Sequence, residues 1–317
     1  MHVQRRTTSQ CVLITALLFL GLSSESICQQ IEPHLYAKIF EVNKPAWVRL
    51  ADLIKQNVPV SHEGPRVLDI GAGPGEPTAT MARLLPTHTF VLTDKQEPMV
   101  EKAKVRTKDM TNIEFHVASA EDLSIFPSAS FDAVTGCYVL MFVDLDKTLQ
   151  EMARVLKPGA LAFVTVLTSN SFYEIAHSSL HELYHSKSFK GVVPALGVNP
   201  LSLSATSQFG ISSVETGVSS MIDKSLKIKT SEDLSYDIHL GDMHATCVAT
   251  FVYGTPFADI AKEYGTTESE LKTAYCAIVE DKIRAHADWE MPDASFRLGQ
   301  VVAKLYTLQK TDTAHEL

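Results

Sequence analysis

The stretch RVLDIGAGPGEPTATMARLL, residues 66–85, constrains the fold of this chain more than any other segment. Its first five residues read as a short β-strand, and its last ten read as a helix. Between them, Gly71, Gly73 and Gly75 let the backbone turn tightly and approach a ligand closely, because no Cβ projects into the turn. A strand, a glycine turn and a helix in this order predict a ligand site at the carboxyl end of the strand.

The following segments repeat this alternation of strand and helix. We expect a helix over 33–56, interrupted near Pro45, before the first strand. Further strands are expected at 89–94, 113–118, 131–140 and 160–167, with helices at 97–106 and 144–156. Such alternation predicts a doubly wound α/β fold, a mostly parallel seven-stranded Rossmann-like sheet with helices on both faces.

The alternation becomes less regular after Thr168. A helix over 169–186, a strand over 219–229, a helix over 268–287 and a final strand over 301–310 are expected. We therefore divide the chain into a leader at 1–28, a ligand-binding core at 33–168, and a region at 169–310. This last region is expected to complete the sheet and to supply a helical cap over the site.

The neighbours of the glycine turn restrict the ligand. The chain has no Gly-Lys-Ser/Thr sequence, which excludes a phosphate-binding P-loop. A dinucleotide turn would place its third glycine at position 76, where Glu76 would instead repel a pyrophosphate. Asp94 ends the next strand, where a carboxylate accepts hydrogen bonds from both hydroxyls of a ribose. These features predict a ligand that contains a ribose and has no phosphate at the turn.

Several motifs in this order resemble those of the class I S-adenosylmethionine-dependent methyltransferases. The chain is most similar to the small-molecule group that includes the ubiquinone/menaquinone C-methyltransferases. The resemblance covers roughly residues 45–168 and rests on the segments VLDIGAGPG, VLTDKQEPMV, ASAEDLSIFPSASFDAVTGCYVL and EMARVLKPGALAFVTV. It implies methyl transfer from S-adenosylmethionine to a small-molecule acceptor.

The resemblance also implies a role for each matching residue. Asp69 and the turn would surround the amino-acid end of the cofactor, and Asp94 would bind the ribose. The chain departs from the family at position 119, where Ser119 replaces an acidic residue that the family often has. The remaining residues would line the ribose, the adenine and the methionyl group. The implied cofactor-binding set is Asp69, Gly71, Ala72, Gly73, Gly75, Asp94, Lys95, Met99, Ser119, Ala120, Glu121, Gly136 and Cys137, with Tyr138 beside it.

Two other functions remain open at this point. One is an NAD(P)-dependent oxidoreductase on a similar sheet, which the glycine spacing disfavours. The other is a non-catalytic protein that binds S-adenosylmethionine. No catalytic residue is assigned, and Cys137 is interpreted as part of the pocket lining and not as a nucleophile.

Two histidine clusters are candidates for other chemistry. His177, His181 and His185 recur every four residues of an expected helix, near Glu182, and His239, Asp242 and His244 share a polar segment. We interpret the first cluster as a solvated helix flank and the second as a polar loop, so no metal site is predicted.

The formal net charge is −9, and the chain has no Lys/Arg-rich block. A nucleic-acid partner is therefore not expected, because such proteins carry a basic surface that neutralises phosphates. The expected partner is a small molecule.

The first 28 residues have the layout of a secretory signal peptide: a basic start, the apolar run CVLITALLFLGL, and small polar residues. This predicts the secretory pathway or endoplasmic reticulum, and the final TAHEL resembles a retention signal with His315 in an acidic position. The alternative is an uncleaved membrane anchor with a cytosolic body. The absence of an Asn-x-Ser/Thr acceptor agrees with that alternative. So do the sparse Cys137, Cys247 and Cys276, which predict no disulfide framework and no zinc site.

Overall fold

The computed structural model describes residues 41–60, 64–171, 174–175, 178–179, 182–183, 216–217, 219, 225–240, 247, 261, 265–286, 288–289 and 296–311. The chain forms two compact units. One comprises residues 42–170, 205–236 and 300–317, and we call it the sheet unit. The other comprises residues 1–41, 171–204 and 237–299, and we call it the second unit.

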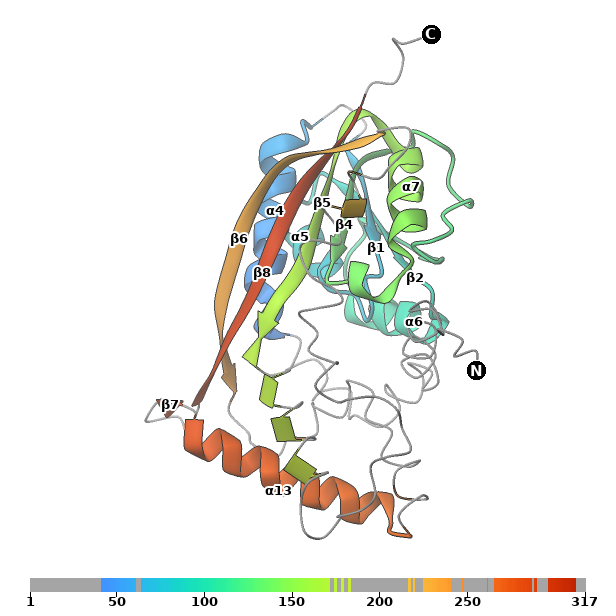
Figure 1. Cartoon of the computed structure of the whole chain (residues 1–317). Helices are drawn as coiled ribbons and strands as arrows, with labels where there is room; N and C mark the ends of the chain where they lie inside the picture. Colours follow the sequence, from blue (N-terminus) through green and yellow to red (C-terminus); the bar gives the residue numbers. More distant parts are fainter. Residues whose placement is uncertain are drawn as a thin grey trace, which may run out of the picture. The chain divides into compact units, whose positions relative to one another are not determined.

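The sheet has the strand order β3-β2-β1-β4-β5-β8-β6, and a short β7 also pairs with β8 (Figure 1). β1, β2, β3, β4 and β5 pair in parallel, whereas β8 is antiparallel to β5. This confirms the predicted mostly parallel, doubly wound sheet. The strands are β1 (Arg66–Ile70), β2 (Thr89–Asp94), β3 (Ile113–Val117), β4 (Phe131–Cys137), β5 (Leu156–Asn170), β6 (Leu226–Leu240), β7 (Asp288–Trp289) and β8 (Phe296–Lys310).

Three helices connect parallel strands: α5 (Thr78–Leu84), α6 (Glu97–Arg106) and α7 (Leu145–Val155). The helix α4 (Lys44–Asn57) precedes β1, and short 3₁₀ segments η1 (Glu41–Asn43) and η2 (Leu140–Phe142) precede α4 and α7. Pro45 lies in the first turn of α4, where a missing amide hydrogen breaks no helical bond. The interruption expected at Pro45 is therefore wrong, because the helix begins there.

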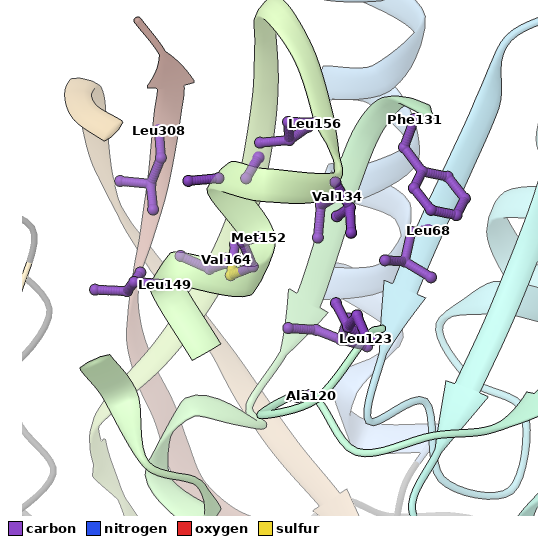
Figure 2. Packing of buried hydrophobic residues seen from close by; sticks show 14 of the residues in the cluster. Leu68, Ala120, Leu123, Phe131, Val134, Leu149, Met152, Leu156, Val164 and Leu308 are labelled. Carbon is purple, nitrogen blue, oxygen red and sulfur yellow. The ribbon is translucent and has the colours of Figure 1, made fainter. Parts of the chain in front are cut away.

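Side chains of alternate strand residues pack on opposite faces of the sheet. Val67, Ala133 and Phe163 pack with α4 and α5 residues such as Leu50 and Met81. Their sequence neighbours Leu68, Val134 and Val164 pack on the other face with Leu149 and Met152 of α7 (Figure 2). Parallel strands covered on both faces are apolar throughout, which explains the short continuous apolar runs in the sequence.

β5 is longer than predicted. It begins at Leu156 and continues to Asn170, whereas the sequence indicated a strand over 160–167. Leu156 already pairs with Phe131 of β4, and a register shift follows. Lys157-Pro158-Gly159, between the expected helix and the expected strand, therefore belong to β5. Ser169 and Asn170 belong to β5 because they pair with Val302 and Val301, so the following helix does not begin at Ser169 as predicted.

The second unit contains α13 (Glu268–His286), as predicted, and a disulfide between Cys247 and Cys276. The sequence predicts no disulfide framework, and the structure shows this one disulfide among the described residues. The two cysteines lie 29 residues apart in the sequence, but folding brings their Cα atoms to 5.4 Å. A search of the described residues finds no helix that is both long and apolar enough to cross a membrane.

Candidate functional site

The glycine turn lies directly after β1, at the carboxyl end of the sheet. Gly71, Gly73 and Gly75 have φ angles of +61°, +54° and +109°, a region that favours glycine. The Ala72 amide donates to the Thr93 carbonyl at 3.0 Å and thereby fastens the turn to β2. The turn is thus held by backbone hydrogen bonds in a conformation that most side chains would oppose.

The glycines have different surroundings. A Cβ added at Gly71 would lie 2.2 Å from Cγ2 of Val139, and one at Gly75 would lie 3.1 Å from Ala103. A Cβ added at Gly73 would meet no atom within 4 Å. Gly71 and Gly75 are therefore needed for packing within the protein, whereas Gly73 opens onto space that a ligand can occupy.

Asp94 lies at the end of β2, beside Gly73. Its Oδ2 accepts from the Gly73 amide at 2.9 Å, and its Oδ1 accepts from the Gln96 amide at 2.9 Å. Burial raises the pKa of Asp94, and the two amide hydrogen bonds partly offset that rise. Each carboxylate oxygen has a second lone pair, so Asp94 can hold the turn and also accept from ligand hydroxyls.

Asp69 is completely buried. It accepts hydrogen bonds from the hydroxyls of Thr78 and Thr135, the latter at 2.8 Å. Burial raises its pKa to about 7, although both hydroxyls favour the charged form. The Gly73 amide donates to Asp94 and not to Asp69.

The predicted adenine-side residues follow β2 and β3. Lys95 is exposed, while Met99 of α6 and Ala120 are buried. Ser119 Oγ accepts from the Glu121 amide at 3.2 Å, and Glu121 Oε1 accepts from the Asp144 amide at 3.0 Å. The segment after β3 is thus ordered by its own polar side chains.

Gly136 and Cys137 end β4, and Tyr138 follows. Burial raises the pKa of the Cys137 thiol to about 12, and the Thr165 hydroxyl lies 3.5 Å from its Sγ. A thiol with so high a pKa is protonated at neutral pH, which agrees with a pocket lining and not with a nucleophile. Tyr138 has a φ of +56°, which is uncommon for a bulky side chain.

Glu76 lies between the glycine turn and α5. Its Oε2 accepts from the Thr80 amide at 3.0 Å, and its Oε1 lies 3.4 Å from a guanidinium nitrogen of Arg106. This ion pair reduces the repulsion of a phosphate that the sequence interpretation attributed to Glu76.

Sequence reasoning missed four residues that support the site. Thr78 and Thr135 hold Asp69, while Tyr236 and Asn43 join Tyr138 in a chain of hydrogen bonds. The threonines lie near the motifs and could have been noticed as possible partners of a buried acid. Tyr236 and Asn43 have no local signal, because they lie 98 and 95 positions from Tyr138 in the sequence.

The histidine clusters cannot be placed. His177, His181, His185, Asp242 and His244 lie outside the described residues, as does the side chain of His239. Glu182 is described: it is exposed and lies 2.9 Å from Nζ of Lys282.

Comparison with known proteins identifies the core. Residues 67–159 match a family described as "Methyltransferase domain". The chain is 34% identical over 139 residues to the ubiquinone/menaquinone biosynthesis C-methyltransferase UbiE of Vibrio cholerae, covering 42% of this chain and 51% of the relative. The Escherichia coli UbiE is 35% identical over 139 residues, which cover 42% of this chain and 53% of the relative. The chain thus spans about half the length of these curated relatives.

Among solved structures, the YcgJ protein of Bacillus subtilis matches with a TM-score of 0.47 and 20% identity, over 83% of this chain and 99% of that one. The family match at 67–159 contains β1, the glycine turn, Asp94 and β4, which are the elements of the site. Residues 67–159 of this chain are therefore similar to a methyltransferase domain, in agreement with the resemblance of the sequence motifs.

Proposed function

We propose that this chain transfers a methyl group from S-adenosylmethionine to a small-molecule acceptor. The observation that carries this proposal is the open space at Gly73, next to the Asp94 carboxylate at the end of β2. A ligand can contact the backbone at Gly73 without a clash while its ribose hydroxyls donate to Asp94. The match over 67–159 and the relatives' names support the same activity.

The residues around the turn fit this cofactor. Asp94 would accept from the ribose hydroxyls, and the backbone at Gly73 would lie against the methionyl end. Buried Met99 and Ala120 offer apolar contacts to the adenine. The Ser119 hydroxyl, held by the Glu121 amide, replaces a carboxylate as the polar contact to the adenine and gives a weaker hydrogen bond.

When bound, S-adenosylmethionine supplies a methyl group that is already activated on a sulfonium. The protein therefore has to bind the acceptor, align its nucleophilic atom with the methyl–sulfur bond, and exclude water. Alignment alone lowers the barrier by several kcal/mol. This explains how the domain can work without the paired acid and base of a hydrolase.

The first test is cofactor binding to the purified full-length chain. Isothermal calorimetry should detect binding of S-adenosylmethionine and of its demethylated product, S-adenosylhomocysteine. Asp94→Ala should weaken binding by about 1.5–3 kcal/mol, the value of hydrogen bonds to a charged group. Asp109→Ala, at an exposed aspartate, is the matched control and should bind like the wild type. Absence of heat with either ligand at millimolar concentration contradicts the proposal, and binding of NADH instead would favour an oxidoreductase.

The second test is methyl transfer. The names of the relatives describe carbon methylation in ubiquinone and menaquinone biosynthesis, so quinols are the first acceptors to try with methyl-labelled cofactor. Label found in a small-molecule product supports the proposal. Cofactor binding without transfer to any acceptor would favour a non-catalytic protein, and preferential labelling of RNA or DNA would overturn the proposed acceptor class.

We also propose that the chain matures in the secretory pathway, in the endoplasmic reticulum. The leader at 1–28 motivates this location, and the disulfide between Cys247 and Cys276 supports it, because disulfides persist in oxidising compartments and are rare in the cytosol. A membrane-anchored chain with a cytosolic body is the alternative.

A fluorescent protein fused after residue 317 separates these locations in isolated microsomes. Protection of the tag from added protease supports the lumen. So does alkylation of Cys137 alone when no reductant is added, because Cys247 and Cys276 are then joined in the disulfide. A digested tag with alkylated Cys276 supports the cytosolic body and contradicts the proposal.

A further inference from the structure

The segment 118–126 joins β3 to β4 and begins beside the candidate site. The Ala118 amide donates to the carbonyl of Asp94 at 3.0 Å. Apart from an isolated bridge between Ser119 and Asp122, this segment forms neither a helix nor a strand. Its backbone groups therefore need hydrogen-bond partners outside regular secondary structure.

Two side chains of α7 supply several of these partners. Oε2 of Glu151 accepts from the Leu123 amide at 2.6 Å. The Arg154 guanidinium donates to the carbonyl of Leu123 at 2.8 Å and to the carbonyl of Phe126 at 2.9 Å. The side chain of Leu123 also packs in the same core cluster as Met152 of α7 (Figure 2). The helix thus holds the segment through both its backbone and its side chains.

Glu151 and Arg154 also bind each other. Nε and one Nη of Arg154 lie 2.7 Å and 2.8 Å from the two carboxylate oxygens of Glu151, so the ion pair is bidentate. The hydrogen bond from Arg154 lowers the pKa of Glu151, which keeps its carboxylate charged at neutral pH. A bidentate pair fixes the orientation of both side chains. Each residue therefore keeps the other directed at the segment.

A second contact joins the segment to the start of α7. Oε1 of Glu121 accepts from the Asp144 amide at 3.0 Å, and Asp144 caps the helix by accepting from the Lys147 amide at 3.1 Å. The Glu121 amide in turn donates to Oγ of Ser119 at 3.2 Å. Both ends of α7 thus hold the segment that carries Ser119 and buried Ala120.

We propose that Glu151 and Arg154 are positioning residues for the cofactor, because they keep segment 118–126 in the conformation that receives the adenosine of S-adenosylmethionine. The inference rests on the proposed function, which assigns the ribose to Asp94 and the adenine to the neighbouring segment. Both residues act through the segment and not by contact with the ligand. Without the ion pair, other conformations of the segment become populated, and the affinity falls with the fraction of molecules that can bind.

The test measures binding of S-adenosylhomocysteine by calorimetry, at a temperature where every variant is folded. Arg154→Ala should bind about tenfold more weakly, the loss expected if the binding conformation falls to about a tenth of the population. Glu151→Ala should show a similar loss. Glu151→Gln keeps an oxygen that accepts from the Leu123 amide, so its loss should be smaller but still measurable. If Arg154→Ala does not fold, Arg154→Lys replaces it, since a lysine cannot reach Glu151 and both carbonyls together.

A second ligand shows which half of the cofactor is affected. Methylthioadenosine has the adenosine but lacks the amino-acid end, and its affinity is measured by displacement of S-adenosylhomocysteine. The Arg154 variant should weaken it by the same factor as the complete ligand, because the loss lies at the adenosine.

Arg49→Ala is the matched control. It removes another bidentate arginine–glutamate pair, with Glu232, from the same unit, and the side chains of Arg49 and Arg154 are 31% and 30% exposed. This variant should bind both ligands like the wild type. Failure of the wild type to bind S-adenosylhomocysteine would contradict the proposed function itself. If the wild type binds it, the inference is overturned by an unchanged affinity in the Arg154 variant, an equal loss in Arg49→Ala, or a loss that spares methylthioadenosine. Absence of displacement by methylthioadenosine in the wild type would overturn it as well.

Discussion

Alanine substitution should impair mainly stability at Gly71 and mainly cofactor binding at Gly73. At Gly71, a left-handed φ of +61° costs an alanine about 1–2 kcal/mol. The new Cβ would also lie 2.2 Å from Cγ2 of Val139, against about 3.5–4.0 Å for an ordinary carbon contact. Relieving such an overlap in a packed core costs about 1–3 kcal/mol more. Gly71→Ala should therefore destabilise the protein by about 2–5 kcal/mol.

Gly73→Ala has the backbone cost alone, about 1–2 kcal/mol, because nothing lies within 4 Å of its Cβ. That Cβ would project into the space assigned to the cofactor. Thermal unfolding with and without S-adenosylhomocysteine measures both effects, since a ligand that binds the folded state raises the midpoint temperature. The Gly73→Ala variant should unfold only a few degrees below the wild type, and the ligand should raise its midpoint temperature only slightly.

A second substitution isolates the clash at Gly71. Val139→Ala removes Cγ2 and leaves a Cβ at 3.0 Å from the new methyl group. In this background, the cost of Gly71→Ala should fall toward the backbone contribution of about 1–2 kcal/mol, with a remainder from the tight 3.0 Å contact. An equal cost in both backgrounds would refute the steric argument. Wild-type ligand stabilisation of Gly73→Ala would refute the assignment of the open space.

Three further outcomes are expected. Replacing Cys247 and Cys276 by alanine should destabilise the second unit by about 3–4 kcal/mol, the loop-closure cost for their 29-residue separation, and reductant should have no further effect on that variant. Burial lowers the pKa of His88, so at low pH the unfolded state binds more protons than the folded state. The contribution of His88 to stability should be complete above a pH of about 6.5 and should decrease as the pH falls below that value. Urea unfolding at several pH values measures this dependence, and His88→Leu should flatten it. A double-mutant cycle on Arg49 and Glu232, whose side chains are 31% and 39% exposed, should give a coupling of about 1 kcal/mol or less that added salt reduces.

Local patterns predicted the first half of the sheet well, and the reason is physical. The strand before Gly71 and the strand ending at Asp94 are short apolar runs bounded by turn residues. The local sequence therefore shows where each strand begins and ends. The start of β5 was missed because Lys157-Pro158-Gly159 are ordinary turn residues, and only pairing with β4 makes Leu156 part of a strand.

Most of the missed contacts depend on residues that are distant in the sequence. The Cys247–Cys276 disulfide requires a fold that brings two isolated cysteines together, and spacing alone does not predict it. In the same way, the hydrogen bond between Asn43 and Tyr236 joins residues that are 193 positions apart in the sequence. Sequence motifs therefore predict the cofactor residues, while contacts made by residues far away in the sequence are visible only in the structure.

The position of β8 between β5 and β6 has a consequence for synthesis. Ribosomes deliver β6 before β8, yet in the sheet β8 lies between β6 and β5. Until β8 is made, β6 cannot take its native place, and both β5 and β6 have edges with unpaired backbone groups that invite pairing with other chains. A nascent chain that stalls after β6 thus lacks β7 and β8 and also has β6 without its native partner. Chaperones that shield sheet edges should bind it longest in this interval.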